Sequence, residues 1–74
     1  MLLFNAPINQ KVKITSIKDY RLKIILLKMG LQEGDIVFIS EKLSNGPIVL
    51  NDRFQEIAIG NKNTRLIEVS PVYA

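Results

Sequence analysis

The chain has 74 residues, of which 47% are apolar, and its ten Lys/Arg and seven Asp/Glu give a formal net charge of +3. So short a chain forms a single domain over residues 1–74, and it needs nearly all its apolar residues for the core because only about 60% of its unfolded surface becomes buried. The sequence contains neither cysteine nor histidine, which excludes a disulfide scaffold, a thiolate metal site and histidine-based acid–base catalysis.

We do not expect the first residues to form a signal peptide, because the apolar residues 2–4 are followed at once by Asn5 and Pro7. No run of the sequence approaches the roughly 20 apolar residues of a membrane-spanning helix. We therefore expect a soluble cytoplasmic domain without direct membrane insertion. The modest positive charge is typical of solvated surface lysines and favours an acidic partner only weakly.

The first predicted element is a strand over residues 11–17. Polar and apolar residues alternate through residues 11–15, and Ile17 extends the pattern, which is typical of a half-buried strand. Pro7 and Asn9 lie just before it and suit a turn.

A helix is predicted over the run from Asp19 to Met29. Asp19 suits the N-cap, and Gly30 suits the position after the helix, where a left-handed residue ends it. At about 100° per residue, two apolar stripes lie on nearly opposite sides of this helix. One stripe contains Leu22, Ile25, Leu26 and Met29, and the other contains Tyr20, Ile24 and Leu27. The basic residues between the stripes are Arg21, Lys23 and Lys28.

The segment after the helix is predicted to turn sharply and to enter a buried strand. Leu31 is expected to fold back as an apolar plug, a frequent companion of a helix that ends in glycine. Gly34 lies in a polar turn over residues 32–35, where it would take a positive φ. Residues 36–39 are continuously apolar, so we expect this strand to be buried on both faces.

The second half of the sequence predicts three further strands separated by turns. Residues 48–50, 54–59 and 65–69 are the strands, with a hairpin turn at 51–53 and another turn at 60–63. Gly46 and Pro47 interrupt regular secondary structure before the first of these strands. The turn residues to which we assign only a structural role are Gly30, Gly34, Gly46 and Pro47.

These elements predict a mainly β fold with five short strands and one helix inserted after the first strand. Five short strands in so small a chain cannot form a two-sheet sandwich with a filled core. We therefore expect a small SH3-like five-stranded barrel, with the helix covering one opening. Apolar edges on such a barrel would allow self-association or strand exchange.

No pattern in the sequence indicates catalysis, a cofactor or a metal site. Glu33 and Asp35 are explained by the polar turn, and the serines and threonines have no histidine to activate them. Gly30 and Gly34 follow a helix instead of preceding one, unlike the glycines of a phosphate-binding loop. Only oxygen ligands are available for a metal, and no Asp-rich loop is present. We therefore expect neither an enzyme nor a bound cofactor or metal.

The second apolar stripe of the helix has two interpretations. In the first, residues 2–4 of the N-terminal arm, or the last strand and tail, cover it. In the second, it is a docking face for another protein, because exposed apolar patches rimmed by charge mark such sites. On this hypothesis the candidate partner-contact residues are Tyr20, Arg21, Lys23, Ile24, Leu27 and Lys28.

Nucleic-acid binding is the alternative class of function. Residues 33–40 (EGDIVFIS) have the cadence of the KOW-type element in SH3-like ribosomal and transcription proteins. The chain lacks the companion basic loop, however, and its five aromatic residues are spread over the predicted elements without forming a stacking platform.

The assembled pattern resembles the FeoA family, the small ferrous iron transport protein A. The likeness is most specific at LLKMGLQEGDIVFI (26–39), which is similar to the hallmark Leu-x-x-Leu-Gly-Leu-x-x-Gly-x-x-Ile. Residues 6–17 and 45–60 are similar to the lead into the first strand and to the Gly-Pro-Ile block, and RLIEV (65–69) fits the closing strand.

Several positions depart from the FeoA pattern. Asn9 stands where glycine is usual, Gly60 where arginine is usual, and Thr64 and Arg65 replace an alanine before the last strand. No role of the missing arginine therefore carries over to this chain. The same barrel also occurs as the C-terminal domain of iron-dependent repressors, so the fold alone does not fix the role.

The resemblance implies an accessory protein of ferrous iron uptake that acts with a polytopic FeoB-like membrane GTPase at its cytoplasmic side. A chain without histidine or cysteine is ill suited to carry iron itself, which favours an adaptor or regulator. The hypothesis is thus a non-enzymatic protein–protein module, held at the inner face of the membrane through its partner.

Overall fold

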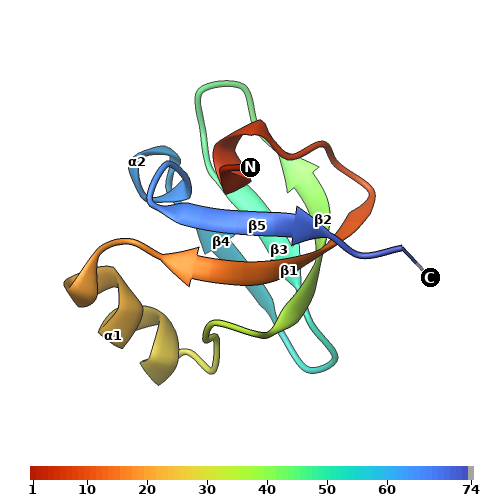
Figure 1. Cartoon of the computed structure of the whole chain (residues 1–74). Coiled ribbons are helices and arrows are strands. Elements are labelled where there is room, and N and C mark those ends of the chain that lie inside the picture. Colours follow the sequence, from red (N-terminus) through yellow and green to blue (C-terminus); the bar gives the residue numbers. More distant parts are fainter. Residues whose placement is uncertain (74) are drawn as a thin grey trace.

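The computed structural model describes residues 1–73 and consists of one curled antiparallel sheet with short helices at its margins (Figure 1). The elements, in chain order, are the 3-10 helix η1 (Leu3–Asn5), β1 (Gln10–Ile17), α1 (Tyr20–Lys28), β2 (Ile36–Lys42), β3 (Ile48–Asn51), β4 (Glu56–Ile59), α2 (Asn61–Thr64) and β5 (Ile67–Pro71). The five strands follow the order β4-β3-β2-β1-β5. This confirms a mainly β fold with a helix after the first strand.

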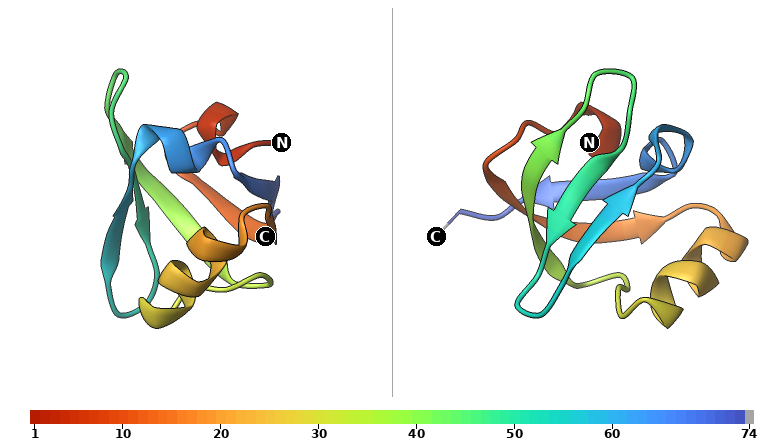
Figure 2. Two further views of the ribbon diagram at one scale, coloured as in Figure 1. Left: turned by 90° about the vertical axis from the view of Figure 1, so that its left-hand side faces the viewer. Right: turned by 180° about the vertical axis from the view of Figure 1, so that it is seen from behind.

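β1 is the strand around which the sheet is organised, because it pairs with β2 on one side and with β5 on the other. Val12 lies opposite Val37 of β2, and Ile14 lies opposite Val69 of β5. Both β1 residues are buried while Lys11 and Lys13 beside them are exposed, which confirms the half-buried strand. The two further views in Figure 2 show how strongly the sheet curls around this strand.

The N-terminal arm packs along β5. The Met1 ammonium donates a hydrogen bond to the Val69 carbonyl (3.0 Å), and the Val69 N–H donates to the Met1 carbonyl (2.8 Å). Leu3 and Ala6 are fully buried in the core. The arm thus covers the edge of β5 and leaves β4 as the edge strand at the other end of the sheet.

α1 begins and ends as the sequence predicts. The Asp19 carboxylate accepts a hydrogen bond from the Leu22 N–H (3.0 Å), which satisfies one of the free donors of the first turn. At the other end, the N–H of Leu31 donates to the Leu26 carbonyl (2.8 Å), and Gly30 takes a left-handed φ of 89°. This hydrogen bond and the left-handed glycine are features of a Schellman motif, and the buried Leu31 supplies its apolar contact.

The prediction that residues 36–39 are buried on both faces is wrong. Val37 and Ile39 are buried, but Ile36 and Phe38 are 50% and 37% exposed. A continuous apolar run indicates burial on both faces only where both faces of the sheet are covered. Here the sheet encloses a core on its inner side alone, so alternate residues of β2 face solvent.

The turn predicted at 60–63 is in fact a short helix, α2, and both neighbouring strands begin two residues later than predicted. The Thr64 hydroxyl donates to the Asn61 carbonyl (2.6 Å), which closes this single helical turn. β4 begins at Glu56 instead of residue 54, and β5 runs from Ile67 to Pro71 instead of 65–69. The polar residues at 60–63 suit either a loop turn or a single helical turn, so the sequence alone does not distinguish the two.

Two asparagines take left-handed backbone conformations. Asn9 takes a left-handed φ of 61°, a conformation that asparagine tolerates better than most residues, so it can replace a glycine there. In the β2–β3 hairpin the left-handed residue is Asn45 (φ 55°), and the Gly46 N–H donates to the Leu43 carbonyl (3.0 Å).

We predict that alanine at the two left-handed glycines destabilises the fold to different extents. At Gly30, the positive φ costs about 1–2 kcal/mol, and an added Cβ would also lie 3.1 Å from Gln55 Nε2. At Gly34 (φ 98°) only the backbone term applies, because no heavy atom lies near the new Cβ. Urea denaturation should therefore rank Gly30→Ala as most destabilising, then Gly34→Ala, with Gly60→Ala least, since Gly60 has an ordinary φ of −61°. Equal losses of unfolding free energy in all three variants would contradict the backbone conformations assigned to these glycines.

Candidate functional site

The second apolar stripe of α1 lies on the surface. Tyr20 is 76% exposed, Leu27 is 57% exposed and Ile24 is 36% exposed, whereas Leu22 and Leu26 of the same helix are buried. Figure 1 shows α1 projecting at one end of the sheet, while the N-terminal arm lies along β5. The interpretation that the arm or the last strand covers this stripe is therefore wrong.

The apolar surface of α1 is wider than the sequence predicts. Ile25 and Met29 share a predicted stripe with the buried Leu22 and Leu26, but both are exposed. The helix contacts the sheet along a narrow line, because it lies beside the end of β1 instead of crossing the sheet (Figure 2). We call the predicted contact residues the α1 face, which consists of Tyr20, Arg21, Lys23, Ile24, Leu27 and Lys28.

The basic residues of the α1 face differ in their contacts. Lys23 Nζ lies 3.0 Å from Glu33 Oε1, and the other oxygen of this carboxylate accepts a hydrogen bond from the Ile17 N–H (2.8 Å). The bond from Ile17 and the pairing with Lys23 together hold the pKa of Glu33 below its ordinary value. Arg21 and Lys28 are exposed and have no acidic partner within residues 1–73. Lys23 thus anchors the helix, while Arg21 and Lys28 are free to meet a partner.

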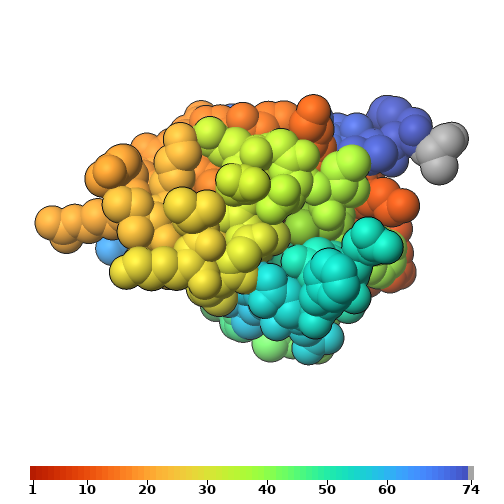
Figure 3. All heavy atoms as spheres, turned by 90° about the horizontal axis from the view of Figure 1, so that it is seen from below, coloured from red at the N-terminus to blue at the C-terminus, as the bar shows by residue number. Residues whose placement is uncertain are grey.

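A second candidate surface lies between the loop that follows α1, β2 and the β3–β4 turn. Two adjoining hollows of about 250 and 420 Å³ share Ile36, Asp52 and Arg53 in their walls, and together we call them the Ile36 groove. Exposed Phe54 lines the first hollow and Phe38 lines the second. Figure 3 views the molecule from this side. Sequence reasoning missed the groove because it assigned Ile36 and Phe38 to the core.

Two acidic residues, Asp35 and Asp52, line the Ile36 groove, and Asp52 forms hydrogen bonds within its own turn. One oxygen of the Asp52 carboxylate accepts hydrogen bonds from the N–H groups of Phe54 (2.7 Å) and Gln55 (2.9 Å). The bond from the Phe54 N–H is the largest cause of the lowered pKa of Asp52. Gln55 Nε2 in turn donates to the Met29 carbonyl (2.6 Å), which ties this turn to the end of α1.

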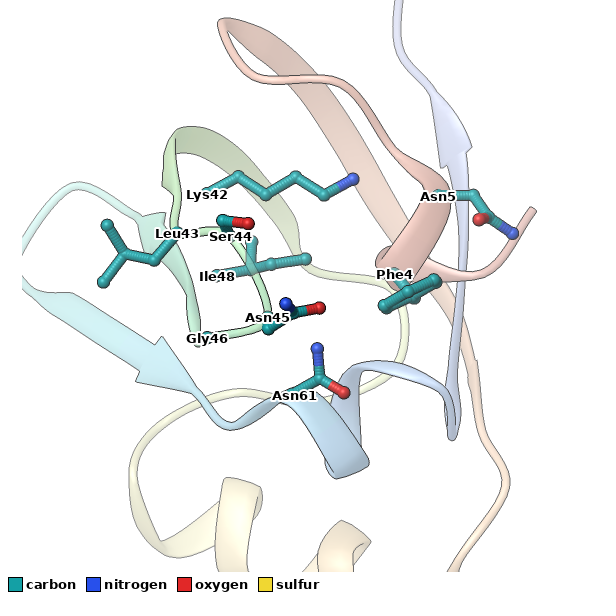
Figure 4. Close-up of a pocket in the computed structure, with 9 residues that line it drawn as sticks. All are labelled: Phe4, Asn5, Lys42, Leu43, Ser44, Asn45, Gly46, Ile48 and Asn61. Carbon is teal, nitrogen blue, oxygen red and sulfur yellow. The ribbon is translucent and has the colours of Figure 1, made fainter.

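A third hollow, of about 430 Å³, lies at the opposite end of the sheet, beneath the β2–β3 hairpin (Figure 4). We call it the Phe4 hollow, and its walls are formed by Phe4, Asn5, Lys42, Leu43, Ser44, Asn45, Gly46, Ile48 and Asn61. These residues come from η1, the β2–β3 hairpin and α2. Sequence reasoning missed the hollow because its residues lie in segments that are far apart in the chain.

Metal binding and membrane spanning find no support in the described part of the chain. In residues 1–73, no three acidic, histidine or cysteine side chains are grouped so that they could hold a metal ion. Over the same residues, no helix has the length and apolar character needed to cross a bilayer.

The family model described as the FeoA domain matches residues 1–71. The chain belongs to the FeoA family. No match is found among curated proteins.

Two solved structures are similar to this FeoA-family chain. The NMR structure of a FeoA-like protein from Clostridium acetobutylicum has 22% sequence identity and a TM-score of 0.84, and the alignment covers 100% of this chain and 88% of the other. The crystal structure of an iron uptake regulatory protein (FeoA) has 22% identity and a TM-score of 0.85, with 97% of each chain covered. At this identity the likeness concerns the fold, and it confirms the predicted SH3-like architecture.

The Glu33 contacts predict a pH dependence of stability. A carboxyl whose pKa is lower in the folded than in the unfolded chain stabilises the fold above its unfolded pKa, here 4.5, and this contribution is lost as the pH falls through the folded value. We expect the free energy of unfolding, measured in urea over a pH series, to fall below pH 4.5 less steeply for Glu33→Gln than for the wild type.

The matched control for this experiment is Glu56→Gln, because Glu56 is exposed and forms no ion pair in the described residues. This variant should keep the wild-type slope. Glu68, whose pKa is lowered by Lys18 and the N-terminal ammonium, and Asp52, whose pKa is lowered by its turn, account for the slope that remains in Glu33→Gln. An unchanged slope in Glu33→Gln would contradict the prediction.

Proposed function

We propose that this chain is a non-enzymatic accessory protein of ferrous iron uptake, which acts by contact with a FeoB-like membrane GTPase. Membership of the FeoA family supports the role in ferrous iron transport. The observation that carries the mode of action is the α1 face, an exposed set of apolar side chains beside free cations. The chain would work in the cytoplasm and reach the inner face of the membrane through its partner.

The apolar part of the α1 face suits a protein interface. Tyr20, Ile24 and Leu27 lie on the outer side of one short helix, and exposed apolar groups that are rimmed by charge mark interaction sites. Burying an aliphatic side chain of this size contributes about 1.5–3 kcal/mol. A few such residues supply most of the affinity of a typical interface.

The helix that carries this face is held at both ends before any partner binds. Asp19 caps its start, and the Gly30 turn closes its end. The ion pair of Lys23 with Glu33 and the bond from Gln55 to the Met29 carbonyl add side-chain restraints. A preorganised surface loses little conformational entropy on binding, so more of the contact energy appears as affinity.

The charges on the α1 face indicate the chemistry of the partner surface. Arg21 and Lys28 are unpaired within the described residues, so an acidic rim on the GTPase would complement them. Such rim charges act mainly on the association rate and are screened by salt. We therefore infer an apolar contact on the partner, surrounded by carboxylates.

We predict that Ile24→Glu and Leu27→Glu each weaken binding to the cognate FeoB-like protein by at least about tenfold, because a charge is placed in an apolar contact. Pull-down and titration with the purified transporter measure the effect. The variants should remain folded, because both positions are exposed and surface changes typically shift stability by less than about 0.5 kcal/mol.

Leu43→Glu is the matched control, because Leu43 is an exposed aliphatic residue in the β2–β3 hairpin at the other end of the molecule. It should bind as the wild type does. Wild-type affinity in both α1 variants would refute the proposed contact face, and a wild-type chain that does not bind the transporter would refute the proposed function.

Nucleic-acid binding remains the second candidate, and the Ile36 groove is the observation that favours it. Phe38, Phe54, Lys11 and Arg53 line the groove, a mixture of aromatic and basic side chains found in single-strand binders. On this hypothesis, binding of single-stranded RNA should fall steeply with salt and weaken in Phe54→Ala. Absence of binding at low salt eliminates this candidate.

A further inference from the structure

The outer edge of β4 has no backbone partner in the part of the chain that the structure describes. The sheet ends at β5 on one side and at β4 on the other. At β5, the Met1 backbone exchanges two hydrogen bonds with Val69, and Leu2 bridges to Glu68. β4 pairs with β3 alone, and Figure 2 shows it as the last strand on its side of the curled sheet. A strand that is paired on one side only leaves backbone N–H and C=O groups free to bind another chain.

The register of the β3–β4 hairpin identifies these free groups. The Asp52 N–H donates to the Gln55 carbonyl at the turn (3.0 Å). In an antiparallel pair, every second residue bonds to the neighbouring strand, so Ile57 is the next residue of β4 that bonds to β3. The N–H and C=O groups of Glu56 and Ala58 therefore point away from β3, and no other described segment bonds to them.

β4 lacks most of the features with which exposed edge strands avoid pairing. Its four residues, EIAI, include neither proline nor lysine, and its pairing with β3 has no bulge. Ile57 and Ile59 are buried, while Glu56 and Ala58 are exposed. The one charged side chain is that of Glu56, which forms no ion pair within residues 1–73. Such an edge is able to accept another strand.

The β4 edge lies beside the end of α1. Gln55 directly precedes β4, and its Nε2 donates to the Met29 carbonyl at the C-terminal end of this helix (2.6 Å). Leu27 and Lys28 of the α1 face belong to the last turn of the same helix. A partner bound to the α1 face would therefore have β4 within reach, so that the two surfaces form one interface.

We propose that β4 binds an extended segment of the membrane partner, which adds to the five-stranded sheet as a further strand. This inference rests on the proposed contact with a FeoB-like transporter and names the element that the partner presents. Backbone hydrogen bonds to Glu56 and Ala58 would supply affinity, as in other complexes formed by strand addition. A lysine or arginine of the incoming segment beside Glu56 would form a cross-strand ion pair.

The first test is hydrogen–deuterium exchange of the backbone amides in the wild-type chain. In the isolated chain, we expect the amides of Glu56 and Ala58 to exchange quickly and those of Ile57 and Ile59 slowly, because only the latter bond to β3. In the complex with the purified FeoB-like transporter, the amides of Glu56 and Ala58 should become protected. Protection in the isolated chain that is lost on dilution would show that a second copy occupies the edge, and would overturn the proposal.

Two variants alter the edge and leave the hydrogen bonds to β3 in place. Ala58→Pro removes the outward N–H, and proline is tolerated on edge strands where this group faces solvent. Glu56→Lys reverses the charge beside the incoming strand. Each should weaken binding to the transporter about tenfold, the loss expected when a backbone hydrogen bond or a charge pair is removed. Thermal unfolding checks that the variants remain folded, and Glu56→Lys decides the test if Ala58→Pro does not fold.

Glu41→Lys is the matched control, because Glu41 is an exposed carboxylate in β2, which lies inside the sheet. It should bind as the wild type does. If the wild type binds the transporter while residues 56 and 58 stay unprotected, or if the edge variants bind with wild-type affinity, the inference is wrong and the α1 face still stands on its own variants. A wild-type chain that does not bind the transporter would refute both this inference and the proposed function.

Discussion

The segment from Gly30 to Asp35 is the connection on which the arrangement of this molecule depends. It closes α1 through the bond between the Leu31 N–H and the Leu26 carbonyl, and it places Leu31 in the core. It is then joined to β1 by two backbone bonds, from the Gly34 N–H to the Ile14 carbonyl (2.7 Å) and from the Ile14 N–H to the Asp35 carbonyl (2.9 Å). The helix is thereby fixed against the first strand by a short loop that contains two left-handed glycines. Most other residues could adopt this backbone conformation only under strain.

The functional surfaces follow from this connection and from the size of the domain. Because the loop holds α1 at one end of the sheet, only Leu22 and Leu26 of the helix reach the core, and the rest of its apolar surface faces solvent. The single small sheet likewise encloses a core on its inner face alone. Ile36 and Phe38 lie on its outer face and are exposed to solvent. A domain with so little interior therefore exposes apolar side chains on several sides, which suits a FeoA-family protein that would act by contact.

The two ends of the molecule expose different residues. At one end, the α1 face and the Ile36 groove combine exposed apolar side chains with cations. At the other end, the Phe4 hollow is lined by Lys42 and three asparagines together with apolar side chains. The two surfaces share no residue. The sheet and its packed core connect the two ends. Structural changes at one end would reach the other only if this core had two discrete packing arrangements.

The sequence alone determined the features that depend on neighbouring residues. The N-cap at Asp19, the left-handed Gly30 and the alternation in β1 are set by local sterics and hydrogen bonds, and each was predicted correctly. Tertiary structure decided which apolar residues are covered, because burial depends on what packs against each face and not on the periodicity of the segment. For that reason β2 was misassigned as fully buried, the exposure of the α1 face stayed open, and the Phe4 hollow became visible only when three distant segments were brought together.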